Sequence, residues 1–128
     1  MDDLQPTFSS FLADVKQRAD IPNLDMGKPL RLYIRSAQLL HKQAVLSRRN
    51  GDLPNALTLL LRFANLVVYQ LPRHADYRRP PDAQVERDLA QLKGDCLRAM
   101  DAAEQVQADL ERWWTEQVGT QLEAQRQA

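Results

Sequence analysis

Few side chains in this sequence are of types that could carry out covalent or acid–base chemistry. The single cysteine, Cys96, could act as a thiol nucleophile, but no histidine lies near it in the chain. The two histidines, His41 and His74, are far apart in sequence and belong to no metal-binding or phosphate-binding motif. The acidic residues after position 80 are spread out rather than paired for acid–base work. The sequence therefore predicts no catalytic residue, no cofactor site and no metal site.

The distribution of charge points to binding instead, because basic residues are concentrated in the middle of a chain that has no net charge. Residues 28–79 hold ten basic and two acidic side chains, or about +8, whereas residues 1–27 and 80–128 carry about −3 and −5. Part of the basic charge can pair with the acidic last helix, and the rest can attract an acidic partner. Nucleic acid is not the expected partner, since the pI is about 6.7 and no nucleic-acid-binding motif is present.

Helices must position these side chains, because apolar residues recur at spacings of three and four along most of the chain. A short N-terminal helix is predicted over residues 7–18, with Thr7 or Ser9 as its N-cap. After a linker, a second helix is predicted over residues 29–49. Its buried face should comprise Leu30, Ile34, Ala37, Leu40 and either Ala44 or Val45.

A turn should then fold the chain back into a helical hairpin, with Gly51 in the left-handed conformation and Asp52 capping the next helix. That third helix, residues 53–71, is apolar almost all round and must be covered on most sides. Pro72 ends it, and a basic loop with two further prolines follows. The polar residues of the third helix form one narrow stripe, which comprises Asn55, Thr58, Arg62 and Asn65.

The last helix is predicted to begin at Asp82 and to carry one narrow apolar seam, with alternating spacings of four and three. The seam comprises Val85, Leu89, Leu92, Cys96, Ala99, Ala103, Val106, Leu110 and Trp113. It is longer than the two preceding helices, so its end, with Trp113 and Trp114, should project beyond them. This aromatic end is a candidate either for contact with a second copy or for packing against the first helix.

Together these elements predict one all-α domain over residues 1–128. An antiparallel three-helix bundle should span about residues 29–118, with an additional short N-terminal helix and a long last helix. No stretch reaches the roughly 18 apolar residues that a membrane span needs, so direct membrane insertion is not expected. One cysteine excludes an internal disulfide and fits the cytoplasm. Because the last helix ends without a stop signal, we expect a piece of a longer protein.

Three strings in the sequence resemble a known family. They are Pro29-Leu-Arg-Leu-Tyr33-Ile-Arg35-Ser36, Asn50-Gly51-Asp52-Leu-Pro-Asn-Ala56-Leu and Leu71-Pro72-Arg73-His74-Ala-Asp76-Tyr77-Arg78. Over about residues 4–115 the chain is similar to the N-terminal MIT-like domain of the AMSH (STAM-binding protein) and UBPY endosomal deubiquitinases. The third string is the most specific, since the helix–turn–helix alone also fits tetratricopeptide hairpins, of which no second copy is present.

The resemblance implies an MIT-like bundle that binds the acidic, amphipathic C-terminal helices of ESCRT-III subunits and so recruits a ubiquitin isopeptidase from the cytoplasm to endosomes. Such a helix would dock through apolar anchors at i, i+3, i+4 and i+7. A JAMM-type zinc isopeptidase domain could follow in the parent chain, although its motif is absent here. The residues expected to contact the partner are Arg31, Arg35, Lys42 and Arg49 of the second helix and Arg73, His74, Tyr77 and Arg78 of the loop.

Two other functions are open. The long seam with Trp113 and Trp114 at its end fits a homodimerisation module, and in the UBPY branch a similar domain is associated with self-dimerisation. Alternatively, the domain regulates a deubiquitinase without carrying catalysis. The basic side chains of the second helix fit an acidic partner and ordinary solvated charge equally well.

Overall fold

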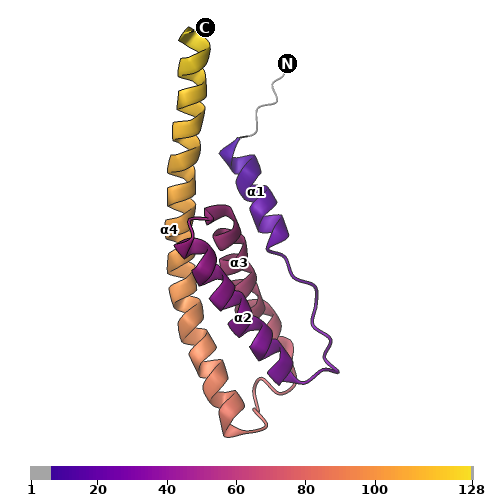
Figure 1. Ribbon diagram of the computed structural model, residues 1–128. Coiled ribbons are helices and arrows are strands. Elements are labelled where there is room, and N and C mark those ends of the chain that lie inside the picture. The colour runs from indigo at the N-terminus through magenta and orange to yellow at the C-terminus, as the bar shows by residue number, and fades with distance from the viewer. Residues whose placement is uncertain (1–6, 128) are drawn as a thin grey trace.

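Four α-helices make up the part of the chain that the structure describes, residues 7–127 without the side chains of Gly119 and Leu122. In this computed structural model, α2 (Leu30–Arg49), α3 (Leu53–Asn65) and α4 (Ala83–Gln127) form an antiparallel bundle (Figure 1). The short α1 (Phe8–Arg18) lies outside the bundle and contacts α3. The predicted all-α class, with its short first helix and long last helix, is confirmed.

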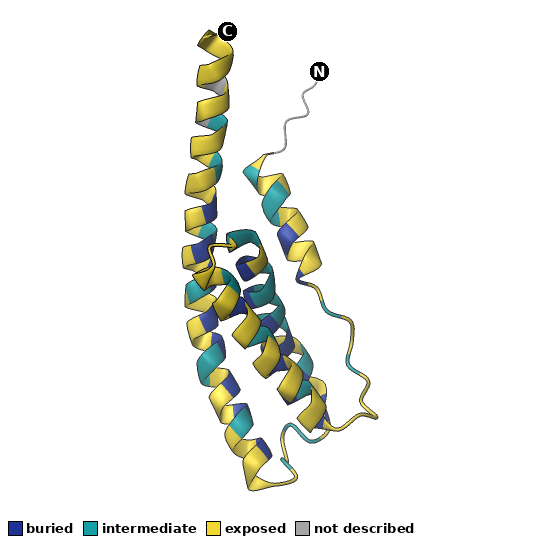
Figure 2. Cartoon of the chain, in the orientation of Figure 1, coloured by how far each residue is buried: buried dark blue, intermediate teal, exposed yellow. Residues whose placement is uncertain are grey.

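Helix α3 lies at the centre, since α2, α4 and α1 all contact it. Phe63 in the last turn of α3 is fully buried, and its ring stacks on half-buried His41 of α2 with 4.9 Å between ring centroids. Figure 2 shows the buried residues along the inner faces of the bundle helices. The predicted core face of α2 is confirmed except at Leu40, which is only half-buried; of the two alternatives, Ala44 is buried and Val45 is exposed.

The predicted caps of the first and third helices and the predicted turn at Gly51 are confirmed. The Thr7 hydroxyl oxygen accepts the Ser10 N–H at 3.0 Å and caps α1. Gly51 has a φ of 79°, a conformation that residues with a Cβ rarely adopt. The Asp52 carboxylate accepts the Asn55 N–H at 3.3 Å and caps α3.

The third helix departs from the prediction, which made it regular as far as residue 71. Its α-helical part ends at Asn65 and is followed by a π-helical segment, η1 (Leu66–Gln70), and a 3₁₀ turn, η2 (Leu71–Arg73). The change comes directly before Pro72, whose ring in a regular α-helix would clash with the carbonyl of the residue four positions earlier. The chain therefore stays helical from Leu53 to Arg73, but it changes from α-helical to π-helical and then to 3₁₀ hydrogen bonding.

Two residues of the polar stripe of α3 hold the end of α1. Arg62 donates to the Arg18 carbonyl oxygen at 3.3 Å, and the Asn65 amide donates to the Ala19 carbonyl oxygen at 3.1 Å. These carbonyls belong to the last turn of α1, where no helical N–H can reach them. The other two stripe residues have other partners, since Asn55 donates to the Ser47 hydroxyl at 2.7 Å and Thr58 donates to the Pro54 carbonyl oxygen at 3.0 Å.

Along α4 the predicted seam is buried from Val85 to Leu110, but its expected last member, Trp113, is 50% exposed. Helix α4 continues past the α2–α3 turn (Figure 1). The neighbouring Trp114 faces α1 instead, with its ring centroid 5.2 Å from that of Phe11 and 6.2 Å from that of Phe8. Packing against the first helix is therefore confirmed for Trp114, and the assignment of Trp113 to the seam was wrong.

Candidate interaction surfaces

Reactive side chains do not converge anywhere within residues 7–127. Cys96 is buried in the α4 seam, and burial raises the pKa of its thiol, which keeps it in the unreactive protonated form. In the same range no three His, Cys, Asp or Glu side chains are grouped as a metal site would require. No described helix is both long enough and apolar enough to cross a membrane.

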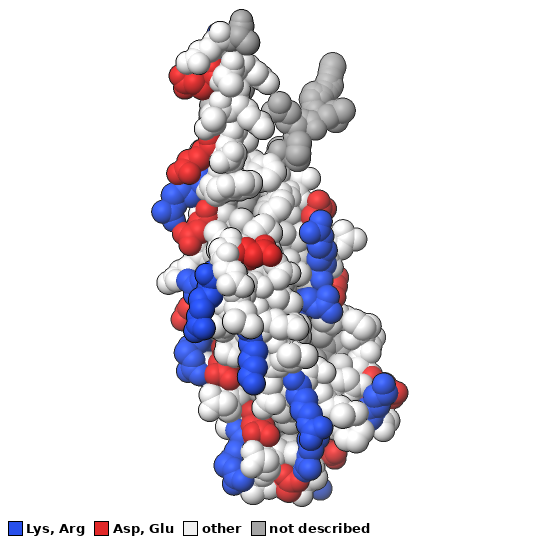
Figure 3. All heavy atoms as spheres, in the orientation of Figure 1, with Lys and Arg blue, Asp and Glu red and all other residues white. Residues whose placement is uncertain are grey.

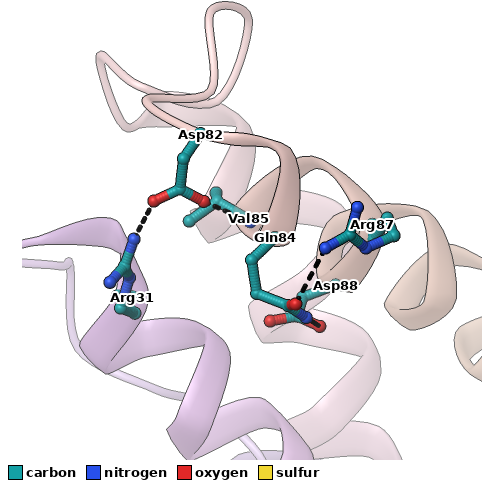
Figure 4. A network of polar contacts seen from close by, with 6 residues as sticks. All are labelled: Arg31, Asp82, Gln84, Val85, Arg87 and Asp88. Carbon is teal, nitrogen blue, oxygen red and sulfur yellow. Dashed lines mark hydrogen bonds and ion pairs between the residues drawn. The ribbon is translucent and has the colours of Figure 1, made fainter.

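Arg31, the first of the predicted contact residues, is used inside the chain. Its guanidinium forms an ion pair with the Asp82 carboxylate (Figure 4). The other oxygen of this carboxylate accepts the Val85 N–H at 2.9 Å, so that Asp82 also caps α4. Arg31 therefore ties the start of α2 to the start of α4, and a partner could engage it only by competing with this pair.

The contribution of the Asp82 charge to stability can be tested by varying the pH. The pKa of its carboxyl lies below the ordinary 3.8, mainly because the carboxylate accepts the Val85 N–H. Desolvation, the second-largest effect, raises this pKa, and the Arg31 charge beside the carboxylate lowers it again. The ionised group therefore stabilises the fold above pH 3.8, and this contribution is lost as the pH falls through the lowered pKa. The variant Asp82→Asn keeps a capping acceptor but lacks the charge.

Asp82→Asn should consequently have a lower Tm than the unmodified chain at neutral pH. The two Tm values should converge between about pH 5 and about pH 2, as the aspartate of the unmodified chain becomes protonated. Thermal unfolding followed by circular dichroism at a series of pH values measures this. Two parallel curves would mean that the Asp82 charge does not stabilise the fold.

The outer side of α2 carries a row of leucines that sequence reasoning missed. Leu32, Leu39 and Leu46 recur every seven residues on the side opposite the core, and all three are exposed large apolar side chains. The exposed Arg35 and Lys42, both predicted contact residues, flank the row by helical spacing. We call these five residues the α2 leucine face. Their seven-residue spacing is visible in the sequence, but spacing alone does not show that a second apolar row on the same helix stays exposed.

A groove of about 480 Å³ runs between α2 and α4 beside the fourth predicted residue, Arg49. No acidic side chain lines it. Its arginines are partly engaged, since Arg48 donates to Gln105 at 2.8 Å and Arg98 pairs with Asp95 at 2.6 Å. The lining residues are His41, Ala44, Val45, Arg48, Arg49, Leu60, Arg98, Ala99 and Ala102. This α2–α4 groove is thus apolar at its base and basic at its rim.

His74 is the predicted contact residue that the structure removes from the surface. It is only 6% exposed. Its Nδ1 accepts the Asp76 N–H at 3.1 Å, which leaves the proton on Nε2, and Nε2 donates to the Lys28 carbonyl oxygen at 2.8 Å. His74 therefore joins the loop after α3 to the linker before α2, and its expected exposure was wrong because a neighbour distant in sequence covers it.

The other predicted loop residues differ in their surroundings. Arg73 is exposed and donates to the Asn23 side-chain oxygen at 3.2 Å. Tyr77 is half-buried, with the Lys93 ammonium 5.2 Å from its ring centroid. Arg78 is exposed. These side chains do not meet those of α2 at one site, and over the face of α2 in Figure 3 basic side chains are separated by acidic and uncharged ones.

A second groove, of about 320 Å³, lies between η1 and α4 and was not predicted. Its walls are almost entirely apolar, and its only charged lining residue is Lys93. Three exposed apolar side chains line it, Val68, Leu97 and Met100, and the exposed Tyr69 follows Val68 in η1. We call these four residues and the groove between them the η1–α4 surface. The full lining comprises Val67, Val68, Pro72, Tyr77, Lys93, Cys96, Leu97 and Met100.

The chain matches one known family of protein domains. Residues 2–117 match the family model of the USP8 dimerisation domain. The chain belongs to this family. No match was found among curated individual proteins.

As a member of the USP8 dimerisation family, this domain is not itself catalytic. The match favours a USP8-type N-terminal domain and does not single out the AMSH branch of the resemblance. The matched residues include the α2 leucine face, both grooves and Trp114, and they end at Gln117, a few residues beyond the contact between α4 and α1. The family match therefore covers all the surfaces described above.

Proposed function

We propose that this domain brings two copies of its parent deubiquitinase together without taking part in the reaction. The match to a dimerisation domain carries the proposal. The exposed apolar side chains support it, since a second copy could cover some of them. Those at least 45% exposed are Leu32, Leu39, Leu46, Val68, Tyr69, Leu97, Met100 and Trp113.

Exchange between copies of different mass tests this proposal. The chain is prepared with and without a short N-terminal tag, the two preparations are mixed, and the mixture is measured by native mass spectrometry. Self-association predicts a species that contains one tagged and one untagged copy. Detection of the two single-copy masses alone, across the accessible concentrations, would contradict it. A monomeric protein of similar size, mixed in the same way, controls for association in the spectrometer.

A second proposal concerns an acidic, amphipathic helix, such as the C-terminal helices of ESCRT-III subunits, which would dock along α2. The α2 leucine face supports it, because it offers apolar anchors over several turns with cations beside them. The α2–α4 groove supports it too, since no acidic side chain lines it. Docking of this kind would recruit the parent deubiquitinase to endosomes from the cytoplasm.

Titration with fluorescently labelled ESCRT-III C-terminal peptides at two salt concentrations tests the second proposal. Binding should saturate and should weaken as salt screens the cations. The double variant Arg35→Glu, Lys42→Glu should lose about tenfold or more in affinity. Lys16→Glu, Arg18→Glu on α1 makes the same change in net charge away from α2, and it should bind nearly as the unmodified chain does. Equal loss in both double variants would indicate a general effect of charge.

A further inference from the structure

The π-helical segment η1 has a consequence for the surface that surrounds it. Segments of this kind are rare and are frequent at functional sites. A π turn contains more residues than an α turn, so side chains in and after it point in directions that the preceding helical pattern would not give. Here Val68 and Tyr69 face solvent, and Tyr69 is 66% exposed, although the residues of η1 just before them are buried. Val68 and Tyr69 are thus two apolar side chains outside the core, at the point where the helical geometry changes.

Helix α4 adds two more apolar side chains at the same place. Leu97 is 70% exposed and Met100 is 50% exposed, and both line the groove that Val68 also lines. The surface therefore combines protruding side chains with a hollow beside them. Exposed aromatic and methionine side chains next to a pocket are enriched at protein–protein interfaces.

Charge decides which kind of partner this surface fits. In a twofold-symmetric dimer the same surface lies on both sides of the contact, so like charges come together. In the α2–α4 groove Arg98 pairs with Asp95, but Arg48 donates to the neutral Gln105 and Arg49 also lines the groove, so two copies facing each other there would bring like charges together. The η1–α4 groove has only Lys93, whose ammonium lies over the Tyr77 ring. Of the two grooves, it is the one that can face its own copy.

We infer that the second copy binds at the η1–α4 surface, where the protruding Tyr69 and Leu97 of each copy pack onto the groove of the other. This assignment rests on the proposed self-association and adds the place where it occurs. The burial of these apolar side chains drives the contact. The α2 leucine face is then left free for an acidic helix.

Leu97→Glu tests the assignment by sedimentation velocity on the full 128-residue chain, with Leu39→Glu of the α2 leucine face as its control. Both leucines are more than half exposed, so both variants should fold, which circular dichroism checks. Leu97→Glu places a carboxylate in the apolar contact and should weaken self-association about tenfold or more. Leu39→Glu should leave it unchanged. Tyr69→Ala, which removes apolar area without adding charge, should weaken it by a smaller factor.

The possible outcomes distinguish a wrong contact surface from a wrong proposal of self-association. Unchanged self-association in Leu97→Glu, with the unmodified chain dimeric, would overturn the assignment and leave the proposed function standing. Loss of self-association in Leu39→Glu alone would overturn it in favour of the α2 leucine face. If the unmodified chain does not associate, the proposed function fails and the assignment fails with it.

Discussion

Replacing Trp114 by alanine is expected to lower the free energy of unfolding by about 3 kcal/mol and to loosen the N-terminal half of α1. Trp114 is the residue of α4 against which the rings of Phe8 and Phe11 pack. Without it, this end of α1 would lose its apolar cover, whereas the other end keeps buried Val15 and the hydrogen bond to Arg62. Urea denaturation followed by circular dichroism measures the free energy, and hydrogen exchange locates the loosened segment.

The adjacent tryptophan provides a matched control. Trp113 is half exposed, and its only aromatic contact is with Trp114. The same change at this position, Trp113→Ala, should cost less than about 1 kcal/mol and leave hydrogen exchange in α1 unchanged. Equal losses of stability in the two variants would contradict the assignment of Trp114 to the contact with α1.

Phe63→Ala should have a still larger effect, a loss of about 4 kcal/mol in the free energy of unfolding. Phe63 is fully buried at the centre of the bundle, in the helix that all the others contact. The variant leaves a cavity that the surrounding helices can fill only in part, and it also removes the ring that stacks on His41. Because a domain of this size has about 5–15 kcal/mol of stability in total, a large part of it would be lost.

Phe63→Leu is the control, since it keeps most of the apolar volume at the same position. It should cost only about 1–2 kcal/mol, and the same urea titrations compare the two variants. A loss below about 1 kcal/mol for Phe63→Ala would show that the centre of the bundle lies elsewhere.

Elements governed by local chemistry could be predicted from the sequence. Thr7 and Asp52 cap their helices through hydrogen bonds that span three residues, and Gly51 takes the conformation that ends α2. The seam of α4 was predictable for a related reason, because burial along one face leaves a periodic pattern. Such signals depend on neighbours close in sequence.

The residue at the end of that seam could not be predicted from the same periodic pattern. A seven-residue repeat and a straight helix of 3.6 residues per turn diverge by about 20° per heptad. Over the length of α4 this drift turns the face next to α1 from Trp113 toward Trp114. The pattern alone does not say whether the helix supercoils to keep the repeat, so the sequence placed Trp113 in the seam although it named both tryptophans as candidates for packing against the first helix.

The candidate surfaces were predicted only in part, because they depend on how distant segments meet. Arg35 and Lys42 are exposed as expected, whereas Arg31 pairs with Asp82 and His74 bonds to Lys28. Both partners lie in segments far from these residues in sequence, and no periodic pattern reveals such pairs. The η1–α4 surface combines exposed side chains of two segments about thirty residues apart, and the pattern of either segment alone does not show that they share a groove.

Sedimentation equilibrium of the unmodified chain tests self-association, the central claim, most directly. The account predicts that the average mass rises with concentration from the 14.7 kDa of one copy toward twice that value. Binding constants fitted to this rise then give the reference for the Leu97→Glu and Leu39→Glu variants. A mass that stays at 14.7 kDa up to about 1 mM, where a dissociation constant corresponds to only about −4 kcal/mol, would contradict the account.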